Sequence, residues 1–196
     1  MLVYLSLIWT VPLSWTSAST ELMRNPFYKM VCITNRNTLY VASKFAKVDS
    51  NFNCIKGGGG CLAREKIVQH AAQKFFVIAD SSKESVNLGE HYSHIPIEVL
   101  PFAVSSVLRS LPRLEGGSAQ LRMAVKKCGP VLTDNNNYII DWTFEKNNTR
   151  NWQEVQMRLA NTPGIVETGL FLGVVDKVYF AYPDGVVKEL EASKKR

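Results

Sequence analysis

The feature that most limits the fold of this 196-residue chain is the apolar run in FFVIAD, residues 75–80. A strand with one face in water alternates apolar and polar residues, whereas an unbroken apolar strand needs cover on both faces. Strands of that kind occur in parallel sheets that carry helices on their two faces. The run therefore predicts an α/β protein whose parallel sheet contains FFVIAD.

Four consecutive glycines stand before this strand, in the segment CIKGGGGCLAREK at 54–66. Ordering four glycines costs entropy, so a folded chain keeps them where backbone turns tightly or approaches a ligand, or else in a flexible linker. Residues 52–55 indicate a strand end, and apolar residues recur at helical spacing over 62–74. A strand, a glycine loop and a helix aim N–H groups and the positive helix end at an anion. We therefore favour an anion-binding loop over a linker.

Together these elements predict one βαβ unit over residues 52–80. Ligands of open α/β sheets collect beyond the carboxyl ends of the strands. The glycine loop and the polar turn DSSK, at 80–83, are therefore expected at the same edge of the sheet.

The second half of the chain predicts a different arrangement. Periodicity indicates strands and helices in the order strand-helix-strand-strand-helix-strand, at 95–101, 102–111, 119–125, 138–144, 151–161 and 165–172. This is the order of a ferredoxin-like α+β domain. Residues 177–190 then indicate a strand, a Pro-Asp-Gly turn and a short strand that returns to the first sheet.

Charge and cysteine content exclude several classes of function. The net charge is +6 with a pI near 9.2, but the basic residues are scattered and no basic-aromatic stripe accompanies them. We therefore expect a solvated basic surface that attracts an anionic substrate, and no nucleic-acid partner. The chain has four cysteines without a CxxC pair, and three histidines. This composition predicts no metal site and no disulfide framework, and it favours a reducing compartment.

The N-terminus allows two interpretations. Residues 2–15 are apolar like a secretory signal, and Asn147-Asn148-Thr149 fits a glycosylation sequon, but no basic residue precedes the apolar run. The run is also short for a membrane span and contains Pro12. We expect a cytoplasmic protein without membrane association, whose first segment is divergent or wrongly predicted; entry into the secretory pathway is the alternative.

The motifs in combination resemble the ribose-5-phosphate isomerases of the A type, over about residues 48–190. The resemblance rests on the segments VDSNFNCIKGGGGCLAREKIV, FFVIADSSK, IPIEVLPFAV, LRMAVKKCGPVLTDNNNYIIDW, TPGIVETGLF and VYFAYPDGVV. It implies a Rossmann-like parallel-sheet domain lacking its N-terminal strands, with a smaller ferredoxin-like domain. The implied boundaries are a divergent apolar segment at 1–47, the Rossmann-like domain at 48–92 and 174–196, and the ferredoxin-like domain at 93–173.

The resemblance also implies a reaction. Members of this family interconvert D-ribose 5-phosphate and D-ribulose 5-phosphate through an enediolate, in the non-oxidative pentose phosphate pathway, as homo-oligomers without metal or organic cofactor. Glu65 matches the proton-transferring glutamate, a role that a partly buried carboxylate suits. Asp80 would have an orienting role. The implied substrate contacts are Lys56, Gly57, Gly58, Gly59 and Lys83. Read without the resemblance, Glu65 is a capping residue of a helix first turn, and Lys83 a solvated lysine.

Two departures from the family pattern keep a second function open. Ser43 and Ala46 stand where the family's Asp-Gly-Ala-Asp-Glu stretch has its two aspartates. Residues 1–40 contain nothing like the family's Gly-Thr-Gly-Ser-Thr phosphate loop. The alternative function is therefore a catalytically impaired paralogue that binds a sugar phosphate or a partner subunit.

Overall fold

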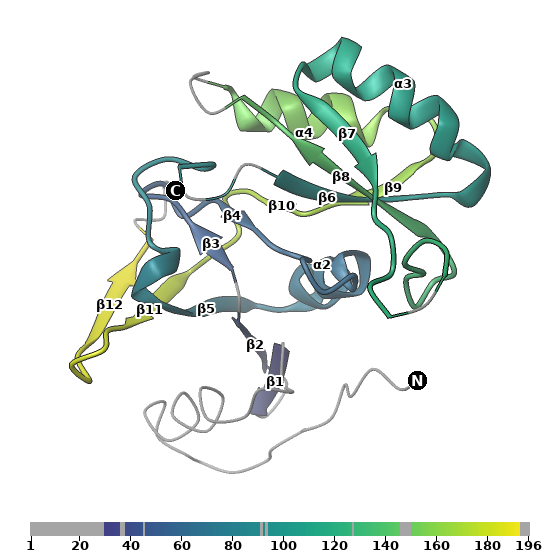
Figure 1. Cartoon of the computed structure of the whole chain (residues 1–196). Helices are drawn as coiled ribbons and strands as arrows, with labels where there is room; N and C mark the ends of the chain where they lie inside the picture. Colours follow the sequence, from purple (N-terminus) through teal and green to yellow (C-terminus); the bar gives the residue numbers. More distant parts are fainter. Residues whose placement is uncertain are drawn as a thin grey trace.

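A computed structural model describes residues 30–35, 38–44, 46–90, 92, 94–126, 128–145 and 150–192, with only the backbone over 30–44. The apolar stretch 2–15 and the sequon at 147–149 lie outside these residues. Two β-sheets with their helices lie on either side of a short third sheet (Figure 1). Among the described residues, no helix is long and apolar enough to cross a membrane.

The larger sheet has five strands in the order β1-β2-β5-β11-β12. Its three inner strands are parallel to one another, and each outer strand is antiparallel to its neighbour. The strands are β1 (Met30–Asn35), β2 (Thr38–Lys44), β5 (Lys74–Asp80), β11 (Lys177–Ala181) and β12 (Val187–Glu191). In β5 the side chains from Phe75 to Ala79 are all buried, which confirms the parallel sheet and the doubly covered strand. The segment expected to be divergent thus contributes β1 and β2 to this sheet.

The strand before the glycine loop does not belong to that sheet. β4 (Cys54–Ile55) pairs antiparallel with β3 (Lys47–Val48) and with β10 (Leu170–Phe171), in a sheet of the order β10-β4-β3. The predicted βαβ unit over 52–80 is therefore wrong. Alternate residues of a strand face opposite ways, so Cys54 enters the core beneath the larger sheet and Ile55 enters the other core. This short sheet joins the two halves of the molecule.

The four-stranded sheet has the order β7-β8-β6-β9, with every neighbouring pair antiparallel. Its elements follow the chain as β6 (His94–Val99), α3 (Val104–Glu115), β7 (Ser118–Leu121), β8 (Tyr138–Thr143), α4 (Trp152–Ala160) and β9 (Ile165–Thr168). This topology is the predicted ferredoxin-like order. The three domain boundaries drawn from the sequence stay a prediction.

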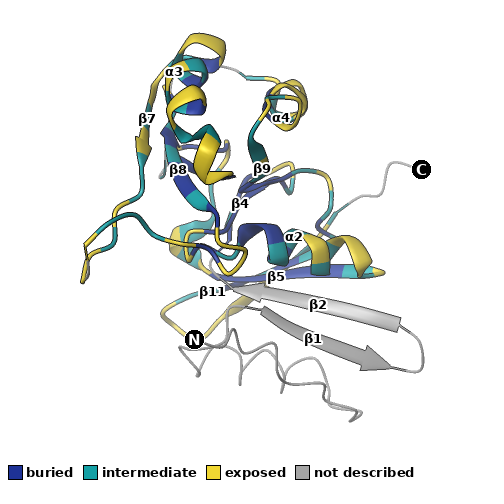
Figure 2. Ribbon diagram, turned by 90° about the vertical axis from the view of Figure 1, so that its right-hand side faces the viewer, coloured by how far each residue is buried: buried dark blue, intermediate teal, exposed yellow. Residues whose placement is uncertain are grey.

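The two faces of this sheet meet different helices. Apolar side chains alternate along β6 and share one core with the buried faces of α3 and α4. The opposite face is turned toward α2 (Leu62–Ala71), which lies between the two larger sheets (Figures 1 and 2). The glycine loop at the start of α2 is therefore placed where both halves can contact it.

Two predicted strands end early, for different reasons. The strand predicted at 119–125 stops at Leu121, because the described residues after it, 122–126 and 128–137, lie outside the named strands and make isolated bridges. The strand predicted at 165–172 breaks at Gly169, where the chain passes from β9 into β10. A Cβ at Gly169 would lie 2.4 Å from the carbonyl oxygen of Lys56, so this crossing needs glycine.

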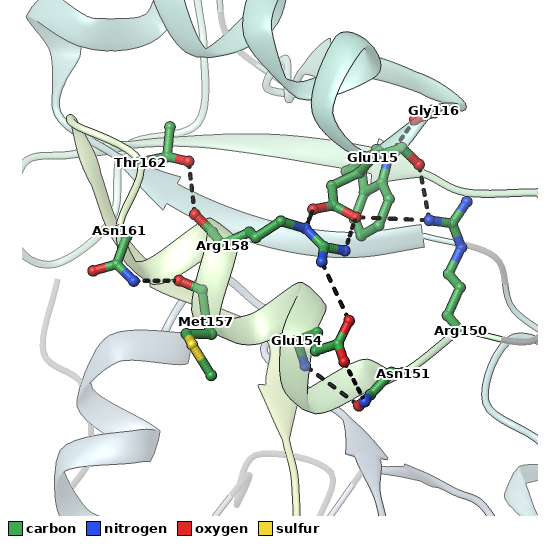
Figure 3. Close-up of polar contacts among 10 residues, drawn as sticks. Glu115, Gly116, Arg150, Asn151, Glu154, Met157, Arg158, Asn161 and Thr162 are labelled. Carbon is green, nitrogen blue, oxygen red and sulfur yellow. Dashed lines mark hydrogen bonds and ion pairs between the residues drawn. The ribbon is translucent and has the colours of Figure 1, made fainter.

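The helix predicted at 102–111 continues to Glu115. The carboxylate of Glu115 connects α3 to α4 (Figure 3). Arg158 donates to both carboxylate oxygens of Glu115, at 2.6 and 2.9 Å. Arg150 Nη1 donates to the Glu115 carbonyl at 2.8 Å and lies 3.8 Å from the carboxylate. The Glu115 side chain is only 1% exposed, so these two arginines compensate a buried charge.

Candidate active site

Lys56 and Glu65 form a buried ion pair at the glycine loop. Lys56 directly follows β4, and Glu65 lies in the first turn of α2. Lys56 Nζ is 3.0 Å from Glu65 Oε2, and the two side chains are 1% and 9% exposed. The interpretation of Glu65 as an exposed capping residue therefore does not fit its environment. The Lys56 N–H donates to the Gly169 carbonyl at 2.8 Å, which holds this backbone in place.

The glycine run forms a tight turn with its middle in solvent. The Gly60 N–H donates to the Gly57 carbonyl at 2.9 Å, so residues 57–60 make a β-turn. Gly57 has a φ of +83°, and a Cβ there would lie 2.4 Å from Cβ of the buried Leu62. Gly58 and Gly59 are exposed. The run is therefore a structured loop at a helix N-terminus, as the anion-binding interpretation requires.

Lys83 lies on a separate turn, at the end of β5. Residues Ser81–Lys83 form one turn of 3-10 helix, and the Asp80 carboxylate accepts a hydrogen bond from the Ser82 N–H at 3.1 Å. Lys83 Nζ lies 3.6 Å from Asp80 Oδ2 and donates to Ser82 Oγ at 3.1 Å. Partial burial would raise the pKa of Asp80, but the Ser82 hydrogen bonds and the charge of Lys83 lower it overall. The contacts of Lys83 described here are thus within its own turn, whereas Lys56 and Glu65 meet directly.

A further lysine stands beside this turn. The parallel bridge between Val48 and Glu84 places Lys47 next to Lys83 in register. Lys47 Nζ also lies 3.4 Å from the centre of the Tyr92 ring. Burial and the charge of Lys83 lower the pKa of Lys47, against the opposing effect of Asp80. Lys47 was not singled out from the sequence, so its place beside Lys83 was not predicted.

Sequence reasoning also missed the residues that hold the glycine loop from the ferredoxin-like side. Arg122 Nη1 donates to the Gly58 carbonyl at 2.8 Å. Arg64, in the first turn of α2, donates to the Asp134 carbonyl at 2.7 Å and to Asn135 Oδ1 at 3.1 Å. The available signal was a charged residue, Arg122, within the segment AQLRMAV that was predicted as a strand.

The geometry suits proton transfer next to a developing negative charge. A carboxylate largely withdrawn from water can act as a base, and an adjacent ammonium with backbone N–H groups can stabilise an oxyanion. Among the described side chains, no group of three or more His, Cys, Asp or Glu is arranged to hold a metal ion.

Solved structures with the same architecture define the class of protein. The chain matches a D-ribose-5-phosphate isomerase in complex with phospho-erythronic acid with a TM-score of 0.73 and 33% identity, over 82% of this chain and 70% of that one. It matches ribose 5-phosphate isomerase A from Methanocaldococcus jannaschii with a TM-score of 0.70 and 37% identity, over 82% and 69% of the two chains. The fold is thus that of the α/β ribose 5-phosphate isomerases.

Sequence comparison leads to the same group. A probable ribose 5-phosphate isomerase of Caenorhabditis elegans is 67% identical over 150 residues, which are 76% of this chain and 60% of that protein. Ribose-5-phosphate isomerase of Homo sapiens is 49% identical over 146 residues, 74% of this chain and 46% of that protein. Residues 13–185 match the family model described as ribose 5-phosphate isomerase A (phosphoriboisomerase A). The chain belongs to this family.

The comparisons also show how much of this chain and of its relatives the matches cover. The family match begins at residue 13, well before the start near residue 48 expected from the motifs. The chain spans about half to three fifths of the length of the curated relatives it matches, 60% and 46% for the two named above.

Proposed function

We propose that this chain interconverts D-ribose 5-phosphate and D-ribulose 5-phosphate. The observation that carries the proposal is the buried Lys56–Glu65 pair at the edge of a structured glycine loop, in a member of this family. Moving a carbonyl between C1 and C2 of an open-chain pentose requires a base that removes the proton from one carbon and returns it to the other. Glu65 fills that role, and the flanking lysine supports the oxygen that becomes negative.

In the direction of the ketose, the Glu65 carboxylate takes the proton from C2 and the aldehyde oxygen becomes negative, which gives the enediolate. The protonated Glu65 then returns the proton to C1, and the proton of the C2 hydroxyl passes to O1. The Lys56 ammonium lies 3.0 Å from the carboxylate, so it can contact that oxygen while the base acts. The Gly57, Gly58 and Gly59 backbone and the Lys83 ammonium are proposed as further contacts of the sugar phosphate.

A second candidate function is binding of a sugar phosphate without turnover. The reason to test it is the segment before β4, where Ala46 is fully buried and Lys47 lies beside Lys83 in register. A site with fewer carboxylates and more cations suits an anion better than it suits the ring opening of a sugar.

The test is conversion of ribose 5-phosphate by the purified chain, coupled to a ketose assay, for the wild type and Glu65→Gln. Loss of the base is expected to lower kcat by about 10²- to 10⁴-fold. Glu154→Gln removes an exposed carboxylate of α4 and serves as the matched control. Equal rates for the wild type and Glu65→Gln would refute the role of Glu65. Saturable binding by calorimetry without turnover would establish the second function instead.

We also propose a cytoplasmic homo-oligomer with the domain boundaries given above. Cys54 and Cys128 are free thiols, as a reducing compartment favours. The Phe102 side chain is fully exposed, next to the half-exposed Leu100, and such apolar surface is typical of protein contacts. Sedimentation velocity would measure the oligomeric state, and a purely monomeric protein would contradict the proposal.

A further inference from the structure

The glycine loop has a contact that its own sequence does not provide. Arg122 directly follows β7 and lies 64 residues after Gly58 in the sequence. Its Nη1 donates to the Gly58 carbonyl at 2.8 Å. The carbonyl belongs to the peptide between Gly58 and Gly59, which is the central peptide of the turn at 57–60. A residue of the ferredoxin-like sheet thus contacts the exposed middle of the proposed anion loop.

The guanidinium of Arg122 is itself held in one orientation. Arg122 Nε donates to Asp141 Oδ2 at 2.7 Å, and Nη2 donates to Asp141 Oδ1. Asp141 lies on β8 and the two side chains are 18% and 26% exposed, so the pair is partly shielded from water. A bidentate fork fixes the plane of a guanidinium, and this leaves Nη1 directed at the loop.

The turn needs such an external constraint. A β-turn can have its central peptide in either of two orientations, and one of them requires a positive φ at the third residue. A side chain there would exclude that orientation, but glycine adopts either sign of φ with little penalty. With glycine at both central positions, the sequence leaves the Gly58–Gly59 peptide free to flip.

The orientation decides which group the loop presents to a ligand. In a planar trans peptide the carbonyl and the following N–H point in opposite directions. With the Gly58 carbonyl turned to Arg122, the Gly59 N–H is directed away from Arg122. After a flip, a carbonyl oxygen would stand in place of that donor, and it would repel an anion.

The surface that carries Arg122 is anchored at a second point. The turn at 133–137 contacts α2 through Arg64, and a buried carboxylate holds this turn. Glu98 is 0% exposed, and its Oε1 accepts hydrogen bonds at 2.9 Å from three side chains of the turn, namely Thr133, Asn135 and Asn137. Hydrogen bonds therefore hold the ferredoxin-like side in place where it meets α2.

We propose that Arg122, oriented by Asp141, is a positioning residue that locks the Gly58–Gly59 peptide so that the Gly59 N–H donates to the substrate oxygen that becomes negative during the reaction. The expected effect on the reaction rate rests on the proposed isomerase function. The orientation of the Gly58–Gly59 peptide does not, and it can be measured without activity. A charge-assisted hydrogen bond shifts the flip equilibrium by about 10- to 100-fold. Removal of one oxyanion donor lowers kcat by about 10²- to 10³-fold in other enzymes.

The first measurement does not depend on activity. Selective ¹⁵N-glycine labelling gives a spectrum of only 12 glycine amides. In Arg122→Gln the Gly58 and Gly59 signals are expected to shift or double, while the glycines outside the loop stay unchanged. The control is Arg158→Gln, which breaks the other bidentate arginine–carboxylate pair, on α3 and α4. Unchanged loop signals in Arg122→Gln would overturn the proposal.

The second measurement separates kcat from KM. Because the Gly59 N–H would act on charge that develops in the transition state, Arg122→Gln is expected to lower kcat by at most the shift of the flip equilibrium, about 10- to 100-fold, with little change in KM. Arg122→Lys keeps the charge but loses the fork, so it should not restore kcat. Full activity in Arg122→Lys, or an unchanged kcat in Arg122→Gln, would overturn the proposal. A wild type without turnover would refute the isomerase function alone, and the glycine spectra would still decide whether Arg122 locks the loop.

Discussion

Substitution by alanine is expected to have opposite effects on stability at two neighbouring glycines of the loop, Gly57 and Gly58. Gly57 has a φ of +83°, and a Cβ there would lie 2.4 Å from Leu62 Cβ and 3.2 Å from Leu62 Cα. Gly58 lies outside this left-handed region, and a Cβ there would have nothing within 4 Å. Gly57→Ala is therefore expected to destabilise the protein, and Gly58→Ala is not.

The magnitude follows from two contributions. A left-handed backbone costs a residue with a Cβ about 1–2 kcal/mol. The overlap with Leu62 adds about 1–3 kcal/mol, because that side chain is fully buried in α2 and cannot move aside without shifting the helix. Gly57→Ala should thus lower the free energy of unfolding by about 2–5 kcal/mol. Gly58→Ala should raise it by up to about 1 kcal/mol, since alanine reduces the entropy of the unfolded chain.

Urea unfolding followed by far-UV circular dichroism measures this difference. With an m-value of about 2 kcal/mol per molar, the midpoint of Gly57→Ala should fall by roughly 1–2.5 M. The midpoint of Gly58→Ala should stay within about 0.5 M of the wild type or rise. Equal midpoints for the two variants would show that the loop is not held in the conformation described here.

Three further predictions concern other sites. Glu115→Gln should lower the free energy of unfolding by about 1.5–3 kcal/mol, because it removes the carboxylate that two arginines share while Arg158 stays half-exposed and Arg150 keeps its bond to the carbonyl; a urea midpoint close to the wild type would contradict this. Burial raises the pKa of the Cys54 thiol to about 12, so iodoacetamide at neutral pH should modify the exposed Cys128 and leave Cys54 intact until the protein unfolds, as peptide mass mapping would show. Hydrogen bonds from Lys188 and Tyr182 lower the pKa of Glu84 below its ordinary 4.5, so its contribution to stability is present above that pH and is lost as the pH falls through the lowered value. Glu84→Gln should therefore lose less stability than the wild type between about pH 5 and pH 3, and parallel losses in the two proteins would refute this assignment.

Local pattern explains the parts of the fold and site that could be predicted. The apolar run from Phe75 to Ala79 indicated a doubly covered strand, since burial of every side chain leaves no other arrangement. The glycine run marked the loop, because a φ of +83° beside Leu62 admits no side chain at Gly57. Resemblance to the family then selected Glu65 as the base, and the structure places it against Lys56. The role of each of these residues in catalysis remains a prediction.

The strand before the loop shows where pattern was insufficient. β4 has only two residues, and so short a segment carries no sequence pattern that predicts which sheet it joins. Its partners, β3 and β10, come from opposite sides of it in the sequence, and their hydrogen bonds assign it to the junction between the cores. Which strands pair depends on the folded chain. The spacing of apolar residues along the sequence therefore could not show that the βαβ prediction was wrong.

By itself, the sequence determined the elements whose signal is contained in consecutive residues: the buried strand β5, the glycine turn and the amphipathic helices α3 and α4. The apolar face predicted for the helix over 62–74 was wrong, because Ile67 of α2 is exposed and Glu65 is buried. Only the tertiary structure decided the contacts between distant segments, such as Arg122 on the Gly58 carbonyl, 64 residues apart, and Arg158 on Glu115, 43 residues apart. The physical reason is that burial and backbone conformation act on each residue locally. A hydrogen bond between side chain and loop, in contrast, depends on which surfaces the folded chain brings together.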